Sequence, residues 1–190
     1  MSDISDFAAA AQEVASMLLA ATSDPADAVH MLSELADFYP STPTPVSAVG
    51  AAMTTMQSGC GDLFRRTSLV ALCRASSSYQ PSSFDDAAAL RAKLTDLLDA
   101  EILIAGDQGE DASFEALRAL RTAVVADLTR RGANLAELMD ITTPTPMPAT
   151  VIAQRVYRDS ERADELVVQA DPRHPAFMPV SFRALSAVFK

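Results

Sequence analysis

Aromatic and arginine side chains are concentrated between Tyr157 and Phe177, a stretch that includes the proline-bounded loop Asp171-Pro172-Arg173-His174-Pro175. Tyr and Arg are enriched where one protein surface is desolvated by another, and loops held by short helices commonly supply such contacts. The chemistry that this pattern favours is noncovalent recognition of a protein partner. The alternative for Tyr157 and Phe177 is a purely structural role in a small core. The candidate interface residues are Tyr157, Arg158, Arg162, Arg173, His174 and Phe177.

The other residues that could do chemistry do not form a catalytic or metal-binding pattern. The chain has two histidines, His30 and His174, and no nucleophile motif accompanies them. Gly59-Cys60-Gly61 lacks the further glycines and the strand-turn-helix context of a phosphate-binding loop. No set of residues has the ligand spacing of a metal site. We therefore expect no enzymatic activity, no cofactor and no bound metal; His30 is expected to be structural and His174 to be a hydrogen-bonded loop residue.

Acidic residues cluster in the middle of the chain, around the tip of a helical hairpin described below. Their spacing does not match the alternating acids, glycine and distal glutamate of a calcium-binding EF-hand. We expect a solvated acidic tip, or a docking patch for a basic partner surface. The residues are Asp96, Asp99, Glu101, Asp107, Glu110 and Asp111.

The charge balance limits the classes of partner. With 25 acidic against 15 basic residues, the 190-residue chain has a formal net charge of −10. Counterion release needs clustered Lys and Arg, so this balance argues against nucleic acid or an anionic membrane as the partner of the whole chain. Arg155, Arg158, Arg162 and Arg173 alternate with acids, which is typical of an ion-paired helix surface. No apolar run approaches the ~18 residues of a membrane span, and Met1-Ser2-Asp3 lacks the basic start of a signal peptide.

The two cysteines, Cys60 and Cys73, are too few for a disulfide framework. On one continuous helix they would lie roughly 20 Å apart, beyond the reach of a disulfide bond. We expect both to act as small buried hydrophobic residues, and we expect the chain to fold in a reducing cytosol.

A helical hairpin at residues 83–132 is the element around which the chain is organised. Apolar residues recur every three or four positions at 90–105 and again at 114–128, and a Gly-Asp-Gln-Gly turn separates the two rows. Ser83, followed three residues later by an acid, is close to a capping box. Gly132 is expected at the left-handed position that follows the second helix.

The residues before the hairpin also predict helices, because their apolar residues recur at steps of three and four. The glycines of Ser58-Gly59-Cys60-Gly61 are expected to interrupt one of these helical rows. The predicted elements are a helix at 3–22, a helix that begins with Asp24 as its cap, a stiff proline-rich spacer at 40–45, a helical row at 46–56 and a helix at 62–78.

After residue 140 the pattern changes from helical to mixed. We expect one more helical turn at 134–139, then strands at 141–143 and 182–188 that pair with each other, with two short helices between them. The order strand, helix, helix, strand is the outline of a LysM-like module. The expected fold class is therefore mainly α: a helical bundle over residues 1–140 and a small LysM-like α+β module over residues 141–190.

Six segments are distinctive in residue type and order: Phe84–Ala87, Leu97–Glu101, Phe114–Leu128, Pro148–Tyr157, Arg162–Leu166 and Arg173–Phe177. Over roughly residues 60–190, they resemble the C-terminal region of the DNA circularisation protein (protein N) of Mu-like phages and prophages, a tail baseplate component. That family carries a separate N-terminal domain, for which this sequence has no room before its helical part, so the sequence is expected to be either a C-terminal portion of a longer protein or a shortened relative. Arg158 stands where many relatives have glycine, and Asp171 stands where asparagine is common.

The resemblance implies a structural virion protein. We expect a non-enzymatic component of a contractile phage or phage-like tail, located in the virion and assembled in the host bacterial cytoplasm. Its expected partners are other baseplate, hub or tube proteins, and the assembled tail is expected to hold several copies. Two alternatives remain: a DNA-binding protein that protects or circularises injected phage DNA, and a peptidoglycan-binding module.

Overall fold

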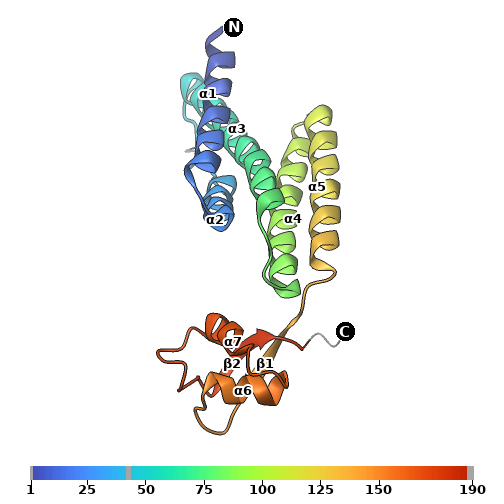
Figure 1. The fold of residues 1–190 in the computed structure, drawn as a ribbon. Coiled ribbons are helices and arrows are strands. Elements are labelled where there is room, and N and C mark those ends of the chain that lie inside the picture. The colour runs from blue at the N-terminus through green and yellow to red at the C-terminus, as the bar shows by residue number, and fades with distance from the viewer. Residues whose placement is uncertain (1, 42–43, 188–190) are drawn as a thin grey trace. The chain divides into compact units, whose positions relative to one another are not determined.

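The computed structural model describes residues 2–41 and 44–187, with side chains from Ser5 onward, and it contains mainly helices (Figure 1). The prediction of a mainly α fold with a small α+β module near the C-terminus is confirmed. Among the described residues, no helix combines the length and hydropathy needed to cross a membrane. In chain order the elements are α1 (Ser2–Ala21), α2 (Pro25–Ala36), α3 (Ala48–Ser78), α4 (Phe84–Asp107), α5 (Asp111–Gly132), β1 (Leu138–Thr142), α6 (Ala149–Val156), α7 (Ala163–Ala170) and β2 (Ser181–Leu185).

The chain divides into two compact units. The first, which we call the body, comprises Met1–Gln80 and Leu90–Leu128. The second, which we call the module, comprises Pro81–Ala89 and Thr129–Lys190. The division differs from the boundary at residue 140 that the sequence predicted, because the first residues of α4 and the segment before β1 group with the module.

Two hydrogen bonds explain why the start of α4 belongs to the module. Phe84 N donates to Ala136 O over 3.0 Å, and Leu138 N donates to the Asp85 carboxylate over 2.7 Å. Both bonds satisfy backbone groups near the ends of elements, where no partner within the element is available.

The body has one core, to which all five of its helices contribute. Leucines on α2, α3, α4 and α5 point into it, and Ala15, Leu18 and Leu19 of α1 pack against them. Figure 1 shows α4 and α5 running side by side in opposite directions, as the predicted hairpin requires. The most deeply buried large side chains of this core are Leu32, Leu69, Leu72, Leu94, Leu98 and Leu128.

The prediction that α3 is interrupted at residues 58–61 is wrong, because α3 is continuous from Ala48 to Ser78. A single glycine inside a helix is tolerated at a cost of about 1 kcal/mol. At Gly61 the residue type has a packing reason, since a Cβ there would lie 2.6 Å from Cδ of Pro40. The glycine therefore marks the place where the proline-rich spacer crosses the helix, and it does not mark a break.

Gly132 is also a close-approach residue, which corrects its prediction as a left-handed helix terminus. It lies inside α5, and the only glycine with a positive φ among the described residues is Gly109, at +70°. A Cβ on Gly132 would lie 2.9 Å from Cβ of Ala87, so a larger residue would push the start of α4 away.

The module has the predicted strand, helix, helix, strand order. The strands β1 and β2 pair antiparallel, with Ile141 opposite Phe182. The predicted strand residue Val188 lies outside the described residues. The predicted helical turn at 134–139 is wrong: β1 already begins at Leu138, because pairing with β2 satisfies the backbone there. The core between the sheet and the two helices includes Ile152, Leu166, Met178 and Ala184.

Candidate partner interface

Tyr157 and Arg162 belong to the framework of the module. Tyr157 follows α6, is buried, and donates its hydroxyl hydrogen to Leu185 O over 2.6 Å. The Arg162 guanidinium carbon lies 3.8 Å from the centroid of the Tyr157 ring, and the same guanidinium pairs with both carboxylate oxygens of Glu165. Burial raises the pKa of Tyr157, and the Glu165 charge raises it further. The structural alternative holds for Tyr157, and Arg162 covers it.

Arg173, His174 and Phe177 lie together on the loop between α7 and β2, and we call these three residues the loop patch. Phe177 is 70% exposed, and its ring centroid lies 6.0 Å from that of His174. His174 Nδ1 accepts a hydrogen bond from Ala176 N over 3.0 Å, which leaves Nε2 as the proton-bearing nitrogen of the neutral ring. Arg173 is exposed and pairs with no described acid. The loop patch therefore offers an aromatic ring and a cation to solvent.

The loop that carries the patch is fixed to the module. Met178, next to the exposed Phe177, is completely buried and anchors the loop in the core. Three backbone hydrogen bonds join the loop to the segment between β1 and α6, so its conformation is set before any partner arrives. They run from Thr143 N to Val180 O (2.7 Å), from Ala149 N to Pro175 O (2.9 Å) and from Met178 N to Met147 O (3.0 Å).

Arg158, the remaining candidate, is exposed and lies in a strained turn. Its φ is +59°, and that of Asp171, which ends α7, is +41°; these are the only non-glycine residues with positive φ in the described part of the chain. Side chains other than Gly, Asn and Asp rarely adopt this left-handed region. No contact places Arg158 in the loop patch.

The body contains a buried ionic network that sequence reasoning missed. Glu101 on α4 is 1% exposed and accepts hydrogen bonds from two consecutive arginines of α3. Arg65 Nε donates to it over 2.8 Å, and Arg66 Nε donates to its other oxygen over 2.7 Å. Burial alone lowers the pKa of both guanidiniums, but hydrogen bonds and charges from their acidic partners outweigh it, so both pKa values are raised. A carboxylate held this way can be buried.

The network closes into a ring through the connection between α4 and α5. Arg65 also pairs with Asp62, and Arg66 Nη2 donates to Gln108 Oε1 over 2.7 Å. Gln108 Nε2 then donates back to Asp62 over 2.7 Å. One signal in the sequence could have indicated a buried acid, because Glu101 stands three residues after the buried Leu98, on the inward-facing row.

The predicted solvated acidic tip is therefore wrong for Glu101 and incomplete for two other acids. Glu110 pairs with Arg66, and Asp99 accepts two hydrogen bonds from Arg121, at 2.6 and 2.9 Å. The arginines that pair with these acids lie twenty or more positions away in sequence, and the acidic spacing gave no indication of them. Of the six acids, Asp96, Asp107, Glu110 and Asp111 are exposed, Glu110 although it is paired.

Within the described ranges, no group of three or more His, Cys, Asp or Glu side chains is arranged to hold a metal ion. Comparison with models of known protein families finds no match, and comparison with curated proteins finds no significant relative.

Proposed function

We propose that this chain is a structural component of a contractile phage or phage-like tail, in the baseplate or hub, and that it acts through protein–protein contacts. The loop patch is the observation that supports this proposal most directly. It combines an exposed aromatic ring with an arginine, the residue types that dominate binding energy at protein interfaces.

The rigidity of the loop strengthens the case for Phe177 and Arg173 as contact residues. A flexible loop loses conformational entropy when it binds, whereas a loop already anchored by Met178 and by three backbone hydrogen bonds loses little. A Phe that is 70% exposed contributes little to the stability of the unit that carries it. Holding Phe177 outward on a fixed backbone is therefore more useful for binding than for folding.

The tail setting rests on the resemblance to the C-terminal region of protein N, and the backbone at two positions supports it. Arg158 and Asp171 stand where glycine and asparagine, respectively, are common in that family, and both adopt positive φ values. Gly and Asn are the residues that tolerate this conformation best. A backbone shared with those relatives would account for their residue preferences. The partners would be neighbouring hub or tube proteins in the virion.

The experiment compares tails assembled with the wild-type chain and with Phe177→Ser or Arg173→Ala. We expect both variants to melt at the wild-type temperature but to be depleted from purified tail particles, because each removes a contact and no internal packing. Val168→Ser is the matched control, since Val168 is 78% exposed on α7, outside the loop patch.

Two results would contradict the proposal at different levels. If the wild-type chain is absent from purified tails, the tail setting is wrong. If both loop variants enter tails as well as the Val168→Ser control does, the loop patch is not the contact surface.

A further inference from the structure

The first half of α3 carries an apolar row that nothing in the described chain covers. The row consists of Val49, Met53 and Met56, preceded by Val46 just before the N-cap residue Ser47, and the exposed fractions of these four side chains lie between 63% and 99%. It continues at Cys60, so the steps alternate between three and four, which is the spacing of the seam in paired helices. A lone apolar row of this length on a soluble helix is uncommon and indicates an interaction surface.

This part of the chain also carries no charge. Between Asp37 and Asp62 there is no Asp, Glu, Lys or Arg, although the whole chain has a net charge of −10. For a different protein as the partner, the absence of charge here would select neither an acidic nor a basic surface. Two copies of this acidic chain, however, repel each other least where the facing surfaces carry no like charges. The neutral row is therefore suited to a second copy.

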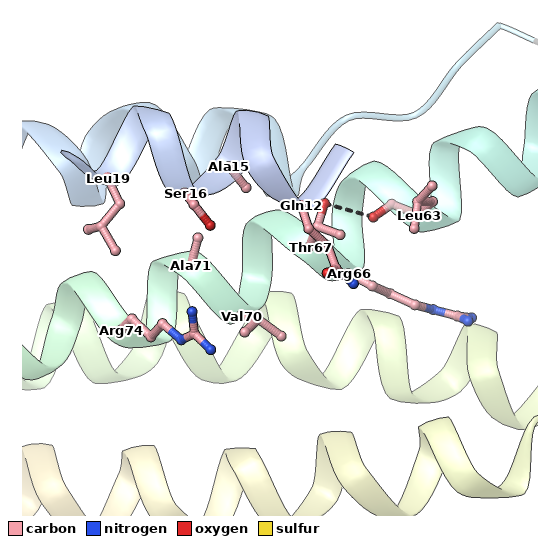
Figure 2. A pocket seen from close by; sticks show the side chains of 10 residues that line it. All are labelled: Gln12, Ala15, Ser16, Leu19, Leu63, Arg66, Thr67, Val70, Ala71 and Arg74. Carbon is pink, nitrogen blue, oxygen red and sulfur yellow. Dashed lines mark hydrogen bonds between the residues drawn. The ribbon is translucent and has the colours of Figure 1, made fainter. Parts of the chain in front are cut away.

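The same row continues along the second half of α3, where it forms the floor of a groove. Leu63, Thr67, Val70 and Arg74 follow Cys60 at the same spacing. Residues of α1 line the same groove, and Figure 2 shows α1 running along α3 there. The groove has a volume of about 350 Å³, and apolar atoms make up most of its lining.

The two halves of the row match in length and differ in shape. Residues 46–60 form an exposed ridge, and residues 60–74 form a groove. At the midpoint lies Gly59, whose absent Cβ would contact nothing within 4 Å in this chain. A glycine in a helix interior costs about 1 kcal/mol, and no contact within the described chain explains why glycine stands at position 59. The close approach of a second helix at this point would explain it.

We infer that two copies of this chain pair through α3, with the helices antiparallel and a twofold axis near Cys60. In this arrangement the ridge of each copy fills the groove of the other, which is the reciprocal contact that a twofold interface requires. The register places Met53 opposite Thr67 of the second copy, and Cys60 opposite itself. The inference does not depend on the tail setting, because it rests only on the body.

The first test measures the mass of the purified chain by analytical ultracentrifugation over about a hundredfold range of concentration, so that mass action can reveal association. The wild-type chain is expected to approach twice its monomer mass at the upper end. Met53→Glu and Met56→Glu together are expected to keep it monomeric, with unchanged helix content. Leu103→Glu is the control, since Leu103 is equally exposed but lies on α4. A wild-type chain that stays monomeric throughout would overturn the inference.

The second test examines the register with a short bismaleimide crosslinker. Cys60 is partly exposed, whereas Cys73 is buried and burial raises its pKa to about 11, so only Cys60 should react near neutral pH. We expect efficient dimer crosslinking that Cys60→Ser abolishes. A dimer that does not crosslink through Cys60, or one that survives the double Glu substitution, would show that a different surface is used.

Discussion

Arg65 of the body and Arg162 of the module each stack on a tyrosine ring, with the guanidinium carbon 4.5 and 3.8 Å from the ring centroid. The two pairs nevertheless have different structural roles. In the body the arginine is buried and the tyrosine, Tyr39, is exposed. In the module the tyrosine, Tyr157, is buried and the arginine lies over it at the surface. The first pair belongs to a network that joins helices, and the second covers the core of a small unit.

The comparison shows that residue type alone does not separate framework from contact surface. The body pairs Arg65 and Arg66 with a buried acid and leaves an apolar row of α3 exposed, whereas the module packs Arg162 over its core and leaves Arg173 and Phe177 exposed. A charge inside the body is acceptable only because it is fully paired. The predictions below test this difference, beginning with the body.

The largest effect is expected from an unpaired charge in the body core. Val124→Asp would place a carboxylate at a buried position of the body core, so it should remove several kcal/mol, comparable to the total stability of a domain. Leu97→Asp should cost less, because Leu97 is only half-buried. Urea denaturation measures both. Leu103→Asp, at an exposed position on α4, is the control, and near wild-type stability for Val124→Asp would refute the assignment of faces.

Removing the charge that neutralises Arg65 and Arg66 should have the next largest effect. Glu101→Gln keeps the side-chain shape but leaves two partly buried guanidiniums without their shared carboxylate, a loss of about 3 kcal/mol. Asp96→Asn removes a charge from the exposed face of the same helix and should change stability by less than about 0.5 kcal/mol. Equal midpoints for the two variants in urea would show that the network does not hold the helices together.

In the module, substitutions that shorten a side chain should distinguish the residues that stabilise the fold from the residues that contact a partner. Tyr157→Ala should cost about 3 kcal/mol through lost packing, and Tyr157→Phe about 1 kcal/mol through the lost hydrogen bond to Leu185. Arg162→Ala should cost about 1 kcal/mol, since it uncovers the ring. Arg173→Ala should leave stability unchanged. Amide hydrogen exchange of β1 and β2 follows the module directly, and strong loss of protection in Arg173→Ala would remove it from the list of contact residues.

The smallest expected effect is an increase in the stability of the module. Arg158→Gly relieves a left-handed conformation and is expected to stabilise the module by roughly 0.5 kcal/mol, the strain less the entropy that glycine adds to the unfolded chain. Arg155→Gly is the matched control: Arg155 is an exposed residue inside α6, where glycine should cost about 1 kcal/mol. The melting temperatures of the two variants should therefore shift in opposite directions. A lower melting temperature in both variants would mean that the backbone at Arg158 is not strained.

Local rules were sufficient wherever the deciding contacts lie within a few residues. Asp24 caps α2 by accepting a hydrogen bond from Ala26 N over 2.8 Å, and Ser83 caps α4 by accepting one from Asp86 N over 3.1 Å. The hairpin and the order of elements in the module follow from apolar periodicity and from prolines and glycines, which act over single turns. These features make up most of the fold.

The sequence predicted which residues belong to the candidate site, but it did not predict which of them are exposed and which are structural. The sequence placed six residues in one interface; the structure leaves Arg173, His174 and Phe177 exposed on a fixed loop, with the His174 and Phe177 rings neighbouring, while it packs Tyr157 and Arg162 against each other in the framework. Exposure decides between these roles. Exposure depends on which side chains pack against a residue, and spacing along the chain does not give that information.

The remaining features were decided by partners far away in sequence. Glu101 is buried because Arg65, 36 positions earlier, meets it across two helices. Residues 58–61 stay helical because packing of α3 outweighs the weak local preference of two glycines, and β1 begins at Leu138 because β2 supplies its backbone partners. The helix or strand preference of a single residue is worth about 1 kcal/mol or less, so a tertiary contact of equal or greater energy overrides it.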